Sequence, residues 1–168
     1  LHEDIADQFI DKMQAIAAGI NIGDPMLEQT EMGPLCTFGQ LETIERELAH
    51  AKTEGATVIC GGQPAKAGSD MFFQPTIVAC PSPDLRIVDT ELFGPVVTVL
   101  RFKDEADANS LANRSKHGLA AGIFTRASAR SLRVGKAVKA GIIWVNTYRA
   151  VSPVAEFGGM KNSRSEER

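Results

Sequence analysis

The C-terminal half of the chain alternates short apolar runs with amphipathic segments, and this alternation limits the possible folds more than any other feature. The apolar runs span 96–100, 120–125 and 141–146, and the helical patterns between them span 104–113 and 128–139. Strands that alternate with helices form right-handed crossovers in a largely parallel sheet. The sequence therefore predicts an α/β fold with three layers, α/β/α, and a largely parallel sheet.

Two further amphipathic helices are predicted in the N-terminal half. One apolar stripe consists of Ile5, Phe9, Met13, Ile16 and Ile20, and a second consists of Leu41, Ile44, Leu48 and Ala51. Because these spacings place each set on one side of a helix, we expect both stripes to pack onto a sheet. The second helix ends at Gly55, and the apolar run 56–60 is predicted as a buried strand. The Pro- and Gly-rich stretch 63–95 holds one short predicted strand, over 72–78.

Length and composition limit the class of protein. A chain of 168 residues that is 43% hydrophobic suffices for one compact domain and is too short for two. The net charge of −3 provides no basic surface for nucleic acid. No apolar run reaches the roughly 18 residues of a membrane span, and the chain opens with His2-Glu3-Asp4 rather than a signal sequence. We therefore expect a soluble, cytoplasmic protein that binds neither nucleic acid nor membrane.

The metal-binding residue types are scattered along the chain. Cys36, Cys60 and Cys80 are odd in number and form no close pair, which favours reduced structural thiols over a disulfide framework or a zinc site. The three histidines share no metal-ligand spacing, and His117 before Gly118 is typical of a helix C-terminus. We expect no bound metal.

Two short motifs border the predicted strands. Glu91-Leu92-Phe93-Gly94-Pro95 precedes the run 96–100, and Glu156-Phe157-Gly158-Gly159 lies beyond the run 141–146. Ligands of open parallel sheets gather at the carboxyl ends of the strands, so loops in these places are candidate binding loops. Taken singly, the first motif is equally an ordinary turn and the second a plain loop with a buried aromatic residue, because short motifs recur by chance.

Together with the strand Gly141-Ile142-Ile143-Trp144-Val145-Asn146, these motifs resemble the C-terminal half of the catalytic domain of NAD(P)-dependent aldehyde dehydrogenases, from Leu1 to about Ser163. The resemblance implies that Glu91 hydrogen-bonds the nicotinamide ribose hydroxyls and that Phe93 packs beside the nicotinamide. A carboxylate suits this role because it can accept two hydroxyl protons at once. The implied cofactor is NAD or NADP.

Two more residues are candidate cofactor contacts by the same resemblance. The segment 116–125 looks like the family's helix-to-strand connection, in which the position of Leu119 lies near the nicotinamide. Gln40 falls where the family often contacts the adenosine side of the cofactor. On the residues alone, Leu119 is as well explained by the core, and Gln40 by the start of an amphipathic helix.

The aldehyde pocket is implied by the region after the last predicted strand. The sequence Trp144-Val145-Asn146-Thr147-Tyr148 resembles the strand end that leads into the family's aldehyde pocket. Val151 and Phe157 would form the pocket wall, with Phe157 in a Phe-Gly-Gly-x-Lys motif. The implied substrate is a small-molecule aldehyde.

The residues that perform the family's chemistry are not found in this sequence. That chemistry needs a cysteine that forms a thiohemiacetal and then a thioester, and a glutamate that activates water. By the resemblance, Leu1 lies a few residues beyond the expected nucleophile, and the cofactor domain would lie further upstream. We therefore expect no catalytic residue here and a fragment that is inactive alone, with exposed apolar surface that drives homo-oligomerisation.

The last residues depart from the family pattern. After Ser163 the family continues Gly-x-Gly-Arg-Glu, whereas this chain reads Arg164-Ser165-Glu166-Glu167-Arg168. We expect 1–163 to form a partial catalytic domain and 164–168 to be a disordered tail from outside the family. The alternative function is a stand-alone module that binds a nucleotide or associates with itself.

Overall fold

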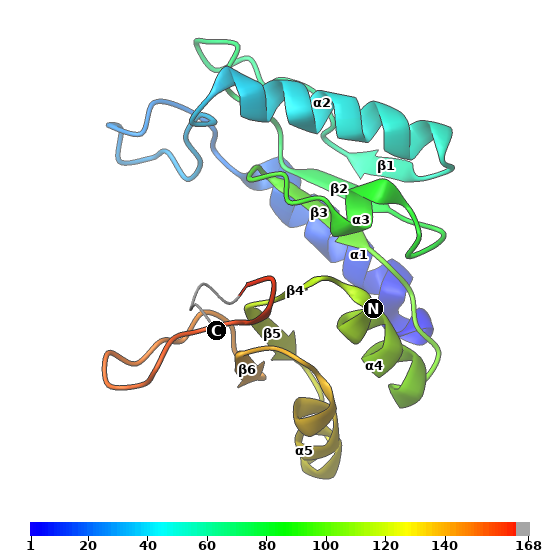
Figure 1. Cartoon of the computed structure of the whole chain (residues 1–168). Coiled ribbons are helices and arrows are strands. Elements are labelled where there is room, and N and C mark those ends of the chain that lie inside the picture. The colour runs from blue at the N-terminus through cyan, green and yellow to red at the C-terminus, as the bar shows by residue number, and fades with distance from the viewer. Residues whose placement is uncertain (164–168) are drawn as a thin grey trace. The chain divides into compact units, whose positions relative to one another are not determined.

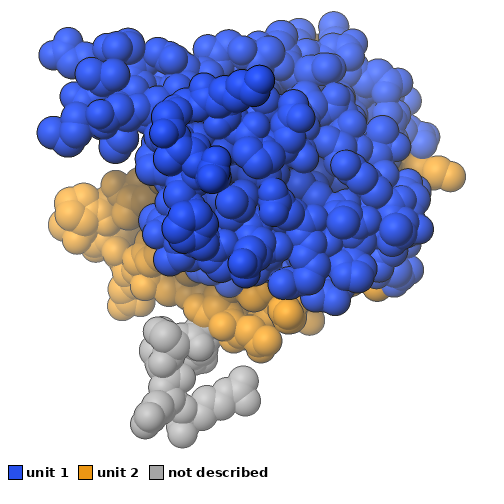
Figure 2. Space-filling model, turned by 90° about the horizontal axis from the view of Figure 1, so that it is seen from above, with its two compact units in different colours: residues 1–101 blue, residues 102–168 orange. Residues whose placement is uncertain are grey.

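The computed structural model describes residues 1–163, and the tail 164–168 lies outside the described residues. The chain has the predicted α/β fold, with helices and short strands alternating along the sequence (Figure 1). It divides into two compact units, residues 1–101 and residues 102–168, coloured separately in Figure 2. Each unit is built around its own strands, so each is described by itself.

Unit 1 contains a three-stranded sheet between two long helices. Its elements are α1 (Glu3–Gly19), α2 (Phe38–Thr53), β1 (Thr57–Cys60), β2 (Thr76–Ala79), α3 (Arg86–Asp89) and β3 (Val96–Val99). The strand order is β1-β2-β3. Strand β3 runs parallel to β2, whereas β1 runs antiparallel to it, because the connection between β1 and β2 contains no helix that could return the chain to the same end of the sheet.

Strand β2 separates the two sides of the core. Successive side chains of a strand point to opposite faces, so Ile77 and Val78 face different helices. Val78 belongs to the cluster under α2, together with the predicted stripe Leu41, Ile44, Leu48 and Ala51, which is thereby confirmed. Ile77 contacts Ile10 of α1 on the other face. Figure 1 shows the resulting three layers, with α1 and α2 on opposite sides of the sheet.

The predicted packing of α1 is wrong. Ile5, Phe9 and Ile16 are 52%, 45% and 69% exposed, and the residues buried against the sheet are instead Ala6 and Ile10. Of the predicted stripe, Met13 contacts the core. The helix is apolar on two adjacent sides, and the side that faces the sheet carries Ala6, Ile10, Met13 and Ala17. The larger side chains are left facing solvent.

Unit 2 contains two strand pairs and two helices. Its elements are α4 (Glu105–Arg114), β4 (His117–Gly118), β5 (Ala120–Ile123), α5 (Ser128–Ala137), β6 (Ile142–Val145) and β7 (Met160–Lys161). The pair β5–β6 is parallel, as predicted for these runs, and β4–β7 is antiparallel. Within the described part of this unit, Gly118 and Ala140 are the only buried residues. The core of unit 2 is therefore much smaller than that of unit 1.

An ion pair joins the two helices of unit 2. Arg133 of α5 donates from Nε and Nη2 to the two carboxylate oxygens of Glu105, at 2.9 and 2.7 Å. These hydrogen bonds lower the pKa of Glu105. A two-pronged contact of this kind fixes geometry better than a single hydrogen bond between exposed groups. It fastens α4 to α5 where few buried side chains do so.

We expect acid to remove the contribution of this ion pair to stability. The folded-state pKa of Glu105 lies below its unfolded value of about 4.3, so the pair stabilises the fold above that pH and the effect is lost as the pH falls through the folded pKa. Thermal melts of the wild type and of Arg133→Gln should therefore differ at pH 6 and converge near pH 3. The control is Arg126→Gln, an exposed arginine next to the same helix. A gap of constant size between pH 6 and pH 3 would contradict the assignment.

Candidate functional site

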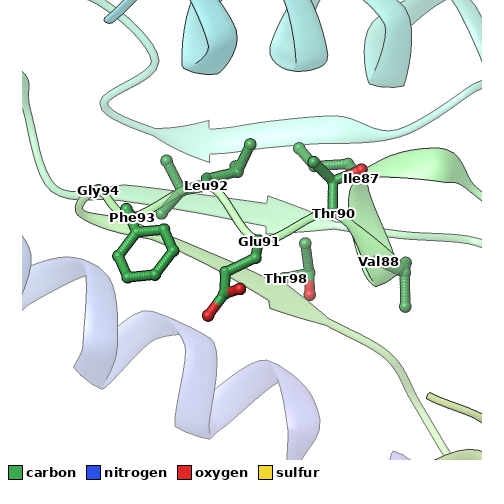
Figure 3. A pocket seen from close by; sticks show the side chains of 9 residues that line it. Ile87, Val88, Thr90, Glu91, Leu92, Phe93, Gly94 and Thr98 are labelled. Carbon is green, nitrogen blue, oxygen red and sulfur yellow. The ribbon is translucent and has the colours of Figure 1, made fainter. Parts of the chain in front are cut away.

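The segment between α3 and β3 forms an open hollow of about 280 Å³ on unit 1. Its lining residues are Ile87, Val88, Thr90, Glu91, Leu92, Phe93, Gly94, Val96 and Thr98. Glu91 and Phe93, two of the four predicted cofactor contacts, thus line one hollow (Figure 3). Thr98 of β3 contributes a hydroxyl to the same hollow.

Side chains alternate along this loop. Leu92 packs against the buried cluster under α2. Figure 3 shows the Glu91 carboxylate and the Phe93 ring on the side opposite Leu92. Both are exposed, the Phe93 side chain at 70%. Within residues 1–163, no side chain or backbone group hydrogen-bonds the Glu91 carboxylate, so both of its oxygens are available to a ligand with two hydroxyl groups.

The backbone of Phe93 adopts a conformation that is unusual for its residue type. Its φ angle is +48°, in the left-handed region that a bulky side chain rarely enters. Such a conformation persists only where the surroundings enforce it, and it is common at binding sites. Here the next residue, Gly94, lies so close to Ile44 of α2 that a side chain at Gly94 would collide with it. The tight fit of Gly94 fixes the path of the loop and keeps the Phe93 ring in solvent.

The downstream end of the loop is held by the sheet. The Thr76 backbone N–H donates to the Pro95 carbonyl at 2.7 Å, and Thr76 is paired in register with Val96. Thr76 is itself buried. Pro95 has no N–H to donate, but its carbonyl takes part in the ladder as an acceptor where β3 begins.

Gln40 takes part in a local helix cap. Its side-chain Oε1 accepts hydrogen bonds from the backbone N–H groups of Cys36, at 3.0 Å, and Thr37, at 3.1 Å. The Thr37 hydroxyl in turn accepts from the Gln40 backbone, which completes a capping box at the start of α2. Gln40 does not line the hollow that contains Glu91 and Phe93. The position of its side chain is explained by the helix start alone.

The other predicted site residues belong to unit 2. Leu119 lies between β4 and β5, and its side chain is 43% exposed. Its carbonyl accepts from the Ile142 backbone at the start of the β5–β6 ladder. Val151 and Phe157 lie after β6, and both side chains are exposed. These three apolar side chains are accessible, as contacts with a ligand require.

The turn after β6 is held by side chains of the strand-end segment 144–148. The Asn146 side chain donates to the Thr125 carbonyl and accepts from the Thr125 N–H, both at 2.9 Å. Asn146 has a φ of +53°, a conformation that asparagine tolerates better than most residues. Trp144 Nε1 donates to the Ala150 carbonyl at 2.7 Å, and its ring lies edge to face with Tyr148. Asparagine directly after a strand is the sequence signal for this turn.

The Phe157 segment is anchored at its downstream end. The Lys161 ammonium group donates to the carbonyls of Asn113 and Ser115, at 3.0 and 2.8 Å, and so satisfies acceptors at the end of α4. The Gly158 carbonyl lies so close to Gly141 that a side chain at Gly141 would collide with it. Lys161 and Gly159 of the Phe-Gly-Gly-x-Lys motif therefore have structural roles in unit 2, because a side chain at Gly159 would collide with the Ser163 carbonyl.

The three thiols differ in their exposure to solvent. Cys36 is exposed, Cys60 is half-buried and Cys80 is buried, and all three are free thiols. Burial raises the pKa of the Cys80 thiol, and the charge of Glu54 adds to this effect. Residues 1–163 contain no cluster of three or more metal-ligating side chains. No helix among them is long and apolar enough to cross a membrane.

Comparison with known proteins identifies the family. The sequence profile of the aldehyde dehydrogenase family matches residues 1–168. The chain is 42% identical over 160 residues to (Z)-2-((N-methylformamido)methylene)-5-hydroxybutyrolactone dehydrogenase of Acinetobacter baylyi, a match that covers 95% of this chain and 33% of that protein. The chain belongs to the aldehyde dehydrogenase family and spans about a third of the length of the curated relatives it matches.

Solved structures agree with this assignment. Betaine aldehyde dehydrogenase from Staphylococcus aureus in complex with NAD+ superposes with a TM-score of 0.91 at 35% identity, covering 96% of this chain and 33% of that one. An NADP-dependent enzyme from E. coli gives a TM-score of 0.91 at 37% identity, covering 96% of this chain and 34% of the other. The predicted family and α/β fold are thus confirmed.

The strained conformation of Phe93 gives a stability prediction. Phe93→Gly should stabilise unit 1 by about 1 kcal/mol, because glycine relieves about 1–2 kcal/mol of left-handed strain and loses part of that gain in backbone entropy. The exposed ring contributes little packing to offset this change. Urea unfolding followed by circular dichroism measures the difference. Phe93→Ala is the matched control, since it removes the ring and keeps the strain; equal stability of the two variants would contradict a strained backbone.

Proposed function

We propose that this chain supplies the nicotinamide-ribose contact and part of the aldehyde pocket of an NAD(P)-dependent aldehyde dehydrogenase, which oxidises a small-molecule aldehyde to a carboxylic acid. The observation that supports this proposal best is the Glu91 carboxylate. It lines a hollow beside Phe93, and neither of its oxygens accepts a hydrogen bond from residues 1–163. The family assignment gives the reaction class. The relatives with NAD+ and with NADP dependence lead us to include both dinucleotides.

The residues of the hollow have distinct roles in this proposal. Glu91 accepts hydrogen bonds from the two ribose hydroxyls and so fixes the rotation of the sugar. Phe93 presents an apolar ring beside the nicotinamide, and the tight fit of Gly94 against Ile44 keeps that ring directed away from the core. A bound nicotinamide would accept a hydride from the substrate. Gln40 is retained as an adenosine-side contact only through surfaces other than Oε1, which the helix cap uses.

The residues of unit 2 contribute apolar surface in this proposal. Leu119 contacts the nicotinamide, and Val151 and Phe157 form part of the wall around the aldehyde. The Asn146 turn and the Lys161 anchor hold the two ends of the segment that contains Val151 and Phe157. Apolar side chains at such a wall exclude water from the reacting carbonyl.

We assign no catalytic group to this chain, and we expect no turnover by the chain alone. An aldehyde dehydrogenase needs an activated thiolate, and the three thiols of this chain lie in a loop, at the end of a strand and in the core. No histidine or other base accepts a hydrogen bond from any of them in residues 1–163. Free thiols and the absence of a described disulfide favour a reducing, cytoplasmic setting.

A titration with NADH tests the cofactor role. We expect weak but saturable binding, observed through Trp144 quenching and the emission of the cofactor. Glu91→Gln should weaken binding about tenfold, because a charge-assisted hydrogen bond contributes about 1.5–3 kcal/mol and a tenfold change in affinity corresponds to about 1.4 kcal/mol.

The matched control for that titration is Glu42→Gln, which removes an exposed carboxylate from α2. Its affinity for NADH should equal that of the wild type. Equal affinities of the wild type and Glu91→Gln would show that Glu91 does not contact the ribose. A lack of saturable binding by the wild type would contradict a nucleotide-binding role for the isolated chain.

A second role, self-association, is favoured by the exposed side of α1. Ile5, Phe9 and Ile16 are all at least 45% exposed along one helix. Apolar side chains grouped in this way mark interaction surfaces, so we propose that two copies of the chain associate through them.

Light scattering measures this association. The mean mass of the wild type should rise with concentration from that of the monomer toward that of the dimer. Ile16→Lys should remain monomeric, whereas Asp11→Lys, which adds positive charge at an exposed position of the same helix, should behave like the wild type. A wild-type chain that stays monomeric at millimolar concentration would contradict the proposal.

A further inference from the structure

Glu47 is a carboxylate buried completely inside the core of unit 1. Its exposure is 0%, and it lies on α2 between the core residues Ile44 and Leu48. One oxygen, Oε1, accepts a hydrogen bond from Arg86 Nη2 at 2.7 Å and also lies 3.4 Å from Arg46 Nε. The other oxygen, Oε2, is buried without a hydrogen-bond partner in the described chain. A buried charge with one unsatisfied oxygen is costly and is weak evidence for a stabilising role.

The partner of Glu47 stands at the start of the segment that leads to Glu91. Arg86 is the first residue of α3, and its backbone N–H donates at 3.2 Å to Glu54, the C-cap residue of α2. Its carbonyl accepts from the Thr90 hydroxyl at 2.9 Å. Thr90 directly precedes Glu91. A short series of contacts therefore runs from the core carboxylate to the residue adjoining the cofactor contact.

Helix α3 depends on such contacts because it has only four residues. A single helical turn is not stable by itself, since nucleation of a helix costs more than one hydrogen bond returns. Leu85 and Ile87 anchor α3 by burial, but an apolar contact does not fix rotation about the helix axis. Arg86 is held by two carboxylates: its side chain donates to Glu47 of α2, and its backbone N–H donates to Glu54, the C-cap residue of that helix.

Helix α2 also holds the other end of the loop. Gly94 abuts Ile44, which lies one turn before Glu47 on the same helix. The segment 86–94 is thus attached to α2 at both ends, through Arg86 at its start and through Gly94 at its end. We propose that Glu47 is a positioning residue: through Arg86 it fixes α3 and Thr90, and thereby sets the orientation of Glu91. The inference rests on the proposed role of Glu91 in nucleotide binding.

Hydrogen exchange with Glu47→Met tests this proposal. Methionine keeps the volume and replaces a buried charge by an apolar group, a change that is often neutral or stabilising for the fold as a whole. Arg86 remains half exposed and can be hydrated when its partner is removed. A purely structural Glu47 would leave local exchange unaltered or slower. We expect the hydrogen-bonded amides of the segment 88–94, such as that of Val88, which donates to the Leu85 carbonyl, to exchange at least tenfold faster, with α1 and the β1–β2 pair unchanged.

Two variants serve as controls. Glu45→Met makes the same substitution at an exposed position of α2 and should exchange like the wild type. Arg86→Lys retains Glu47 and keeps a positive charge facing it, so its exchange should remain within threefold of the wild type. If Glu47→Met does not fold, the double variant Glu47→Met with Arg86→Met removes both partners of the ion pair and should show the same local acceleration.

Exchange rates of residues 88–94 that match the wild type would overturn the proposal, as would an equal acceleration over the whole of unit 1. NADH titration is a separate readout, in which Glu47→Met should bind at least fivefold more weakly than Glu45→Met. If the wild type does not bind NADH, the proposed function of the isolated chain fails, while the exchange comparison still decides whether Glu47 positions the loop.

Discussion

The two-sided burial of strand β2 is the constraint on which unit 1 depends. Ile77 and Val78 are adjacent in sequence and contact opposite helices, so one strand joins α1 and α2 into a three-layer structure. The same strand fixes the register of β3, because a slip of β3 by one residue would exchange its two faces. The Glu91 loop enters β3 directly. Its position is therefore set by the same burial that forms the core.

The loop that contains Glu91 combines tight packing against α2 with a strained backbone at Phe93. Phe93 occupies a left-handed conformation next to a glycine that touches α2, and α3 on its other side is a single turn. None of these features is favourable by itself. They persist because α2 restrains both ends of the segment, which illustrates how a rigid helix can hold a functional conformation that the local sequence does not prefer.

The sequence predicted the class of fold well because the periodicity of α2 and the apolar runs of β3, β5 and β6 are each unambiguous. The α1 prediction failed because that helix has two apolar sides, and periodicity alone selects the one with the larger residues. Glu91 and Phe93 could be singled out as a short motif, and the structure places them in one hollow. The buried pair Glu47 and Arg86 could not be predicted, because a glutamate at that position of an amphipathic helix is indistinguishable in sequence from a surface charge until the tertiary contacts are known.

The unequal cores of the two units have a consequence for how the chain unfolds. Unit 1 buries an apolar cluster on each side of its sheet, whereas the described part of unit 2 buries only Gly118 and Ala140, and its one parallel pair, β5–β6, forms a sheet of two strands. Parallel strands normally occur in larger sheets that are covered on both faces. Because unit 2 buries so little, we expect it to lose its structure at a lower temperature than unit 1, so that a heating curve would contain two overlapping transitions.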